Sequence, residues 1–161
     1  SENFSLSSCP LSKDLASGYF VTGDTYKSQN IDIIKNGVLQ THLLSLYGAN
    51  KTGGKRISNN GGANIISQGT DSLENMIKNI EKGILLCRFS GGMPSDNGDF
   101  SGVAKNSYYI ENGKIKHPVI ETMISGNISK MFLDINNIST ENINFGDRIL
   151  PWISFNGLTI S

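Results

Sequence analysis

The chain has 161 residues, of which 37% are hydrophobic and 17% charged, and its 14 basic and 14 acidic side chains cancel. A chain of this length is expected to form one domain that buries about 70% of the surface its unfolded form exposes. The basic residues are scattered, which excludes the clustered positive charge of a nucleic-acid-binding face, and the low net charge argues against disorder.

The amino-terminal residues, Ser1 to Ser12, lack the basic start and long apolar run of a signal peptide. No segment approaches the roughly 20 apolar residues that a membrane helix requires. Cys9 and Cys87 are the two cysteines of the chain, too few for a disulfide-dense secreted scaffold. We therefore expect a cytoplasmic protein that binds neither membranes nor nucleic acids.

Asn-Gly dipeptides mark the turns, and they stand at 36–37, 60–61, 97–98, 112–113 and 156–157. Because both residues tolerate positive φ, the pair favours tight hairpin turns. The first pair predicts a hairpin of Ile31 to Lys35 with Val38 to Leu46. The fourth predicts a hairpin of Tyr108 to Glu111 with Lys114 to Thr122, and turns this frequent indicate a β-rich domain.

Two helices are expected between the strands. The first extends from about Asp71 to Lys82. Its capping pair would be Asp71 and Glu74, and Gly83 would end it. The second begins after Gly126, with Asn127 as its expected N-cap. Apolar residues recur in both at the spacing of a helix face that packs on a core.

Three further strands are expected. Ile84 to Phe89 is apolar enough to be buried on both faces, and Trp152 to Phe155 and Leu158 to Ile160 follow near the end. The sum is an α+β fold, mostly antiparallel β in a sandwich or barrel-like arrangement with hairpins and two short helices. Residues 1–17 are a poorly specified leader, and 18–161 form the body of the domain.

Side chains that carry chemistry are few. His42 and His117 are far apart and belong to no recognised metal motif. The stretch from Gly48 to Arg56 superficially resembles a phosphate loop, but its spacing is off by one and Arg56 replaces the Ser or Thr that binds magnesium. Cys87 is expected to be unreactive inside its apolar strand. A thiol enzyme pairing Cys87 with either histidine is therefore a disfavoured alternative.

A linked series of motifs identifies a resemblance. In chain order it comprises Phe89-Ser90-Gly91-Gly92, Gly98-Asp99-Phe100-Ser101, the hairpin from Tyr109 to Ile115, His117-Pro118-Val119, and the run from Thr122 to Ile128. This order is similar to the carboxy-terminal domain of the PmbA/TldD family, whose members are also called modulators of DNA gyrase and peptide-maturation metalloproteases. Looser matches extend over most of the chain after about Gly18.

The resemblance implies a cytoplasmic, two-component metallopeptidase that processes peptides. In the family, a TldD-like subunit holds zinc through an upstream H-E-x-x-x-H helix and a cysteine near the end of this domain. Neither is present, since Glu141 to Pro151 contains no cysteine, so the chain looks more like the PmbA (TldE) partner. We expect no catalytic residue, metal ligand or cofactor in this chain, and zinc only in a TldD-like partner.

Family members are longer, so the chain is expected to be one domain of a longer protein that helps to form the subunit interface and the substrate passage. Its expected partners are a TldD-like subunit or a second copy, as a dimer, and the peptide substrate. The family-motif residues are the candidates for these contacts: Gly91, Gly92, Gly98, Phe100, Ser101, Asn112, Gly113, His117, Gly126 and Asn127. The alternative is an independent β-rich ligand-binding module, suggested by the Asn- and Gly-rich loops and the low charge.

Overall fold

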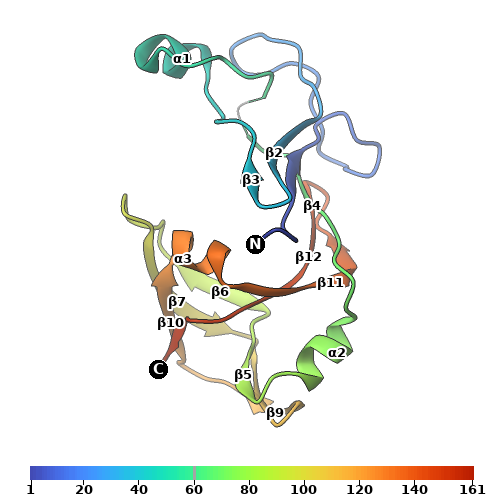
Figure 1. Cartoon of the computed structure of the whole chain (residues 1–161), viewed down its shortest axis with the longest axis vertical. Helices are drawn as coiled ribbons and strands as arrows, with labels where there is room; N and C mark the ends of the chain where they lie inside the picture. The colour runs from blue at the N-terminus through green and yellow to red at the C-terminus, as the bar shows by residue number, and fades with distance from the viewer. Residues whose placement is uncertain (60) are drawn as a thin grey trace. The chain divides into compact units, whose positions relative to one another are not determined.

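The computed structural model describes residues 1–59 and 61–161 (Figure 1). Contacts divide them into two compact units. The first contains Ser1–Gly69 and Glu141–Trp152, and the second contains Thr70–Thr140 and Ile153–Ser161. Asn60, in the Asn-Gly pair expected to turn at 60–61, lies outside the described residues.

The first unit is built around a six-stranded sheet with the strand order β11-β12-β4-β1-β2-β3. Its strands are β1 (Leu6–Ser8), β2 (Ile31–Lys35), β3 (Val38–Leu39), β4 (Asn64–Ile66), β11 (Ile135–Asn144) and β12 (Arg148–Phe155). β1 pairs antiparallel with β2 and β4, whereas β12 pairs parallel with β4. Residues 135–140 of β11 and 153–155 of β12 belong to the second unit.

The β2–β3 hairpin turns at Asn36 and Gly37, whose φ values of 49° and 76° are those that an Asn-Gly turn requires. The predicted second strand is wrong in length, because β3 ends at Leu39 and a helix, α1 (Leu46–Thr52), occupies the residues beyond Ser45. Ser45 caps this helix by accepting the Gly48 N–H at 3.2 Å, and Gly53 ends it with φ 70°. Among residues 1–59 and 61–161 there are thus three helices instead of the two expected.

A buried polar network joins three segments of the first unit. The Asn59 side chain is fully buried, and its Nδ2 donates to the Gln29 carbonyl at 2.6 Å and to Ser8 Oγ at 3.1 Å. Its Oδ1 accepts the Gln29 N–H at 3.1 Å. Ser8 Oγ in turn donates to the Gly62 carbonyl at 2.9 Å. Because buried polar groups must be paired, Asn59 fixes the two loops on either side of β1.

Two antiparallel sheets form the second unit, one ordered β13-β10-β7-β6 and the other β5-β8-β9. Their strands are β5 (Lys82–Leu85), β6 (Arg88–Gly91), β7 (Asp99–Lys105), β8 (Tyr108–Glu111), β9 (Lys114–Pro118), β10 (Met123–Asn127) and β13 (Thr159–Ile160). Two short helices accompany them, α2 (Leu73–Lys78) and α3 (Ile128–Leu133). Ile110, in the central strand β8, is fully buried. The expected α+β fold, mostly antiparallel β, is confirmed.

The first predicted helix is shorter and capped differently. Ser72, not Asp71, is the N-cap of α2, and its hydroxyl accepts the Asn75 N–H at 3.2 Å. Glu74 instead forms an ion pair with Lys78 at 2.7 Å. The helix ends at Lys78 with Asn79 as its C-cap, instead of reaching Lys82 before Gly83, and β5 already begins at Lys82. For the second helix, the predicted cap is confirmed, since Asn127 Oδ1 accepts N–H groups at the start of α3.

The predicted buried strand from Ile84 to Phe89 is wrong, because β5 and β6 belong to different sheets with a break between them. Ser107 explains the break: its buried hydroxyl accepts the Cys87 N–H at 3.1 Å and donates to the Lys105 carbonyl at 2.8 Å. Cys87 lies in the break and is exposed, so the prediction that an apolar strand surrounds it is also wrong. The strand predicted to reach Thr122 ends at Pro118.

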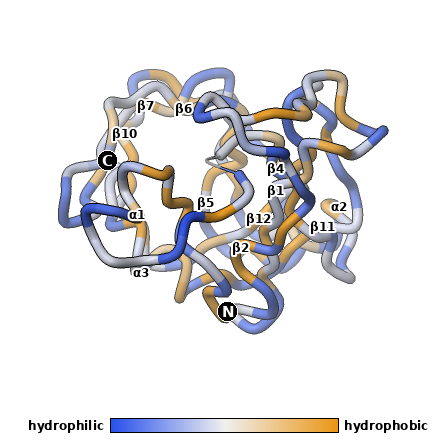
Figure 2. The backbone as a smooth tube through the Cα atoms, turned by 90° about the horizontal axis from the view of Figure 1, so that it is seen from above, coloured by the Kyte–Doolittle hydropathy of each residue, from blue (hydrophilic) through white to orange (hydrophobic). Residues whose placement is uncertain are grey.

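Hydrophobic residues occur in short stretches along the whole chain, alternating with hydrophilic ones (Figure 2). Strands that bury one face produce this pattern. Among residues 1–59 and 61–161, no helix is long and apolar enough to cross a membrane.

Candidate functional site

Several of the residues expected to contact substrate or partner lie on adjacent strands of the four-stranded sheet. Gly91 ends β6, Phe100 and Ser101 lie in β7, and Gly126 and Asn127 end β10. The strand register pairs Phe100 with Gly126 and places Gly91 opposite Gly102. Neighbouring strands β7 and β10 can be followed in Figure 1. Motifs that are up to 36 residues apart in the sequence thus meet on one sheet.

Close packing explains the glycines of this sheet. A Cβ atom on Gly91 would lie 2.6 Å from both the Phe89 ring and the Ser101 carbonyl oxygen. A Cβ on Gly126 would lie 2.5 Å from Leu158 Cδ2 and 3.3 Å from the Phe100 ring. The two phenylalanine rings pack edge to face with centroids 5.9 Å apart. Gly92 differs, since nothing lies within 4 Å of its Cβ position, so a ligand backbone could approach there.

The turn before β7 is held by hydrogen bonds from its own side chains and from Asn127 in β10. Asn127 Nδ2 donates to the Asn97 carbonyl and to Asp99 Oδ1, each at 2.9 Å, and Asn97 Nδ2 donates to Asp99 Oδ2 at 2.8 Å. These hydrogen bonds, from Asn127 first and then Asn97, lower the pKa of Asp99. Gly98 adopts φ 88° at the tip and its carbonyl accepts the Ile128 N–H. Asn127 therefore holds this turn and caps α3 together.

The remaining candidates lie on the β8–β9 hairpin. Asn112 and Gly113 turn with φ values of 50° and 70°, as an Asn-Gly hairpin requires. The tip packs on the segment after α2, where the Asn112 N–H donates to the Glu81 carbonyl at 2.7 Å and the Gly113 N–H to the Ile80 carbonyl at 2.9 Å. His117 lies in the edge strand β9 and stacks on Tyr109 with ring centroids 5.3 Å apart.

A pocket of about 490 Å³ lies in the second unit, a volume within the range of small-molecule sites. It is lined by Lys82, Gly83, Ile84, Tyr109, His117, Val119, Thr122 and Ile160. Of the ten candidates taken from the sequence, His117 alone lines it. For the other lining residues the sequence offered one signal, the alternation of side chains along a strand. Alternation alone does not show which sheet faces enclose a pocket.

The potential metal-binding side chains of the described residues do not fit the zinc that the family resemblance implies for a TldD-like subunit. In the described parts of the chain, no group of three or more His, Cys, Asp and Glu side chains could hold a metal ion. His42 belongs to the first unit and His117 to the second, and both are exposed. Burial, and then the charge of Asp32, raise the pKa of the Cys9 thiol.

Arg56, which stands where the phosphate-loop motif requires Ser or Thr, has a structural role in the first unit. Its guanidinium binds Asp24 through two nitrogens, at 2.6 and 3.2 Å, and lies 3.7 Å from the centre of the Tyr26 ring. The Arg56 hydrogen bond, helped by those from Thr22 and the Leu46 N–H, holds the pKa of Asp24 well below its usual range. Gly48 lies inside α1, so no glycine loop precedes that helix.

Comparison with known sequences identifies one family. The model of the PmbA/TldA metallopeptidase C-terminal domain matches residues 1–161. Metalloprotease PmbA of Escherichia coli O157:H7 is 36% identical over 156 residues, which are 91% of this chain and 34% of that protein. A metalloprotease PmbA homolog of Buchnera aphidicola subsp. Acyrthosiphon pisum is 36% identical over 133 residues, 78% of this chain and 30% of that protein. The chain thus spans about a third of the length of the curated relatives it matches.

Solved structures agree. A putative modulator of DNA gyrase from Bacteroides thetaiotaomicron covers 100% of this chain with 37% of its own, at a TM-score of 0.87 and 26% identity. One from Thermotoga maritima covers 99% of this chain with 39% of its own, at a TM-score of 0.84 and 26% identity. TldE from Thermococcus kodakarensis shares the fold, with a TM-score of 0.79 at 23% identity over 100% of this chain and 40% of its own. The chain therefore belongs to the PmbA/TldD metallopeptidase family, as a carboxy-terminal domain of that family.

Proposed function

We propose that this chain is the carboxy-terminal domain of the PmbA/TldE-like component of a cytoplasmic, two-subunit metallopeptidase that processes peptides. It contributes to the subunit interface and to the substrate passage, while zinc is held by a TldD-like partner. The observation that carries the proposal is the 36% identity to a metalloprotease PmbA over 91% of the chain. The segment from Glu141 to Pro151, where the family resemblance places a cysteine ligand of TldD-like subunits, contains no cysteine, which supports the assignment to the component without zinc.

The edge of the first unit's sheet supports a role in subunit contact. β3 is the last strand of the sheet order, and both of its residues are exposed, Val38 by 60% and Leu39 by 53%. Phe20 and Tyr47, in the same unit, are exposed by 77% and 73%. Exposed apolar side chains and an unpaired strand edge are features of surfaces that other proteins cover.

The second unit supports a role in holding peptide. β6 is an edge strand that ends at Gly91, and Gly92 beyond it is open to an approaching backbone. Ser101, on the neighbouring strand β7, is exposed. An edge strand binds extended peptide through main-chain hydrogen bonds, a mode that tolerates many sequences. Substitution of Gly92 or Ser101 is expected to weaken substrate contact.

Co-assembly tests the proposal. The intact protein is mixed with a TldD-like subunit, and the mass of the complex and the hydrolysis of a peptide are measured. We expect a heteromeric complex to form, and peptide hydrolysis to occur in the mixture but not with either subunit by itself. Val38→Asp should weaken the association of the two subunits. The matched control is Ile120→Asp, which charges an 82% exposed apolar residue of the second unit. Hydrolysis by a complex of identical subunits, or no association at all, would contradict the proposal.

A further inference from the structure

The pocket of the second unit has an aromatic wall and a single cationic end. Ile84 in β5 and Tyr109 in β8 are paired residues of antiparallel strands, so their side chains share a face. Lys82, two residues before Ile84, lies on that face as well. His117 stacks on Tyr109 with an interplanar angle of 29°, and all four residues line the pocket. Val119 and Ile160 add aliphatic side chains to the lining, and Gly83 and Thr122 complete it.

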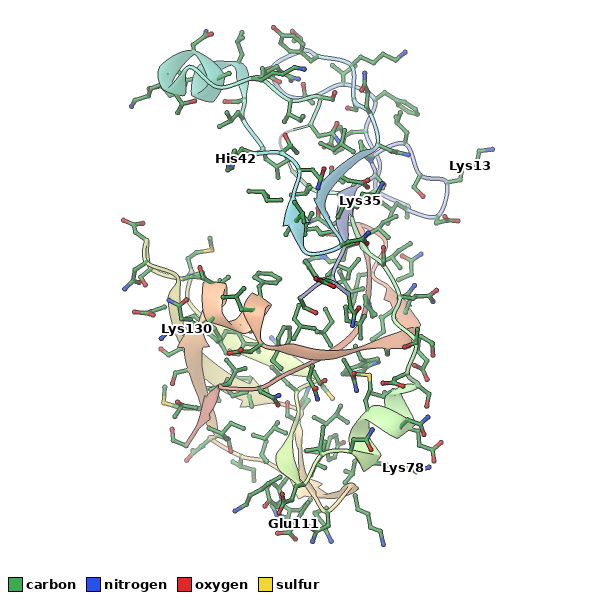
Figure 3. The ribbon with its side chains drawn as sticks, viewed as in Figure 1. Lys13, Lys35, His42, Lys78, Glu111 and Lys130 are labelled. Carbon is green, nitrogen blue, oxygen red and sulfur yellow. The ribbon has the colours of Figure 1, made fainter. Side chains whose placement is uncertain are left out.

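The Lys82 ammonium is available to a ligand. Ion pairs in the described residues join Lys35 to Asp32, Arg56 to Asp24, Lys78 to Glu74 and Arg148 to Asp147, and none includes Lys82. The facing carboxylate across the strands is Glu111, which is labelled in Figure 3. Glu111 accepts the Tyr109 hydroxyl at 3.4 Å. The Glu111 carboxylate limits the positive potential, so the polar end suits one negative charge.

We propose that this pocket binds the carboxy-terminal residue of a peptide, with its carboxylate on Lys82 and its apolar side chain on the Tyr109–His117 stack. The identification of the ligand as a peptide rests on the proposed function. The pocket then recognises a free chain end, which the main-chain contacts of an edge strand do not distinguish from the middle of a peptide.

Charge and composition favour a carboxylate over a phosphate. Sites for phosphate groups gather several arginines or a helix N-terminus around two or more negative charges. Here the lining contains one lysine, and Glu111 is its cross-strand neighbour. A monoanion attached to an apolar group matches this combination, because burial of the apolar part adds affinity that a single exposed ion pair does not supply.

Calorimetric titration of the intact protein, without a partner subunit, tests the inference. The probes are N-acetyl-glycyl-phenylalanine with a free carboxylate, the same compound as its amide, and inorganic phosphate. We expect the acid to bind about tenfold more tightly than the amide, as expected for one charge-assisted hydrogen bond. Lys82→Gln should remove that difference. The matched control is Lys116→Gln, since Lys116 is exposed on β9 and does not line the pocket.

Two further variants separate the parts of the site. Glu111→Gln should strengthen binding of the acid and leave the amide unchanged, because it removes a competing negative charge. His117→Phe should keep the affinity of both probes, whereas His117→Ala should weaken both. The inference is overturned if neither probe binds, if acid and amide bind equally, if Lys116→Gln acts like Lys82→Gln, or if phosphate binds more tightly than the acid.

The outcome is distinguishable from that of the co-assembly experiment. Loss of the preference for the acid while the heteromeric complex still forms and hydrolyses peptide overturns the pocket assignment alone. A preference for the acid that depends on Lys82, in a protein that associates with no partner, supports the pocket and contradicts the proposed function.

Discussion

Gly113 offers a direct test of whether a family-motif glycine is required by the fold. Its φ is 70°, and Gly53 at the end of α1 has the same φ, so alanine at either position meets the same backbone penalty. That penalty is about 1–2 kcal/mol for a residue with a Cβ in the left-handed region. The two sites differ in their surroundings, and a pair of substitutions therefore isolates the effect of packing.

The contacts around each glycine show how far the two losses of stability should differ. A Cβ on Gly113 would lie 2.6 Å from the Lys78 carbonyl oxygen and 3.0 Å from Lys78 Cα, whereas nothing lies within 4 Å of the position on Gly53. The backbone hydrogen bond from the Gly113 N–H to the Ile80 carbonyl resists a shift of the turn. Overpacking of this kind adds about 1–3 kcal/mol. Gly113→Ala is thus expected to cost about 2–5 kcal/mol and Gly53→Ala about 1–2 kcal/mol.

Denaturant titration of the intact protein measures both losses, and amide hydrogen exchange of β8 and β9 shows whether the loss is local to the hairpin. The expected result is faster exchange in β8 and β9 for Gly113→Ala and unchanged exchange there for Gly53→Ala. Equal destabilisation by the two substitutions would refute the packing argument. Retained stability with lost substrate or partner binding in Gly113→Ala would assign Gly113 to contact instead of to the turn.

Three other expectations concern buried and titrating side chains. Asn59→Ala should lower the free energy of unfolding by about 1–3 kcal/mol, because it removes the hydrogen bonds of a fully buried amide to the Gln29 backbone and to the buried Ser8 hydroxyl, and an unchanged denaturation midpoint would refute this. The lowered pKa of Asp24 means that its interactions stabilise the fold above about pH 4 and are lost as the pH falls further, so Asp24→Asn should flatten the acid limb of the stability profile. Iodoacetamide at pH 8 should modify the exposed Cys87 before Cys9, whose pKa burial raises, and Cys87→Ser should abolish the fast phase; faster reaction at Cys9 would contradict this.

Local chemistry made the hairpins and the second helix predictable. Asn36-Gly37 and Asn112-Gly113 place positive φ where a tight turn needs it, and Asn127 caps α3 through its own neighbours. The signals for α1 were also local, with Ser45 before it and Gly53 after it. They were missed because the apolar run that begins at Val38 favoured a long strand.

Contacts between residues far apart in the sequence determined the features that local patterns did not predict. The apolar run from Ile84 to Phe89 is broken because Ser107, 20 residues from Cys87, takes the N–H that a continuous strand would have placed in its ladder. β1 is an inner strand because β2 and β4 pair with its two sides. The pocket joins β5, β8 and β9 with Ile160, and no local pattern predicts that combination.

Metal analysis of the intact protein, purified alone and then mixed with a TldD-like subunit, tests the proposed function most directly. Zinc per chain and peptide hydrolysis are measured on the same samples. We expect substoichiometric zinc and no hydrolysis from the protein alone, and both zinc and hydrolysis in the mixture. Stoichiometric zinc together with hydrolysis by the protein alone would contradict the assignment of this chain to the component without metal.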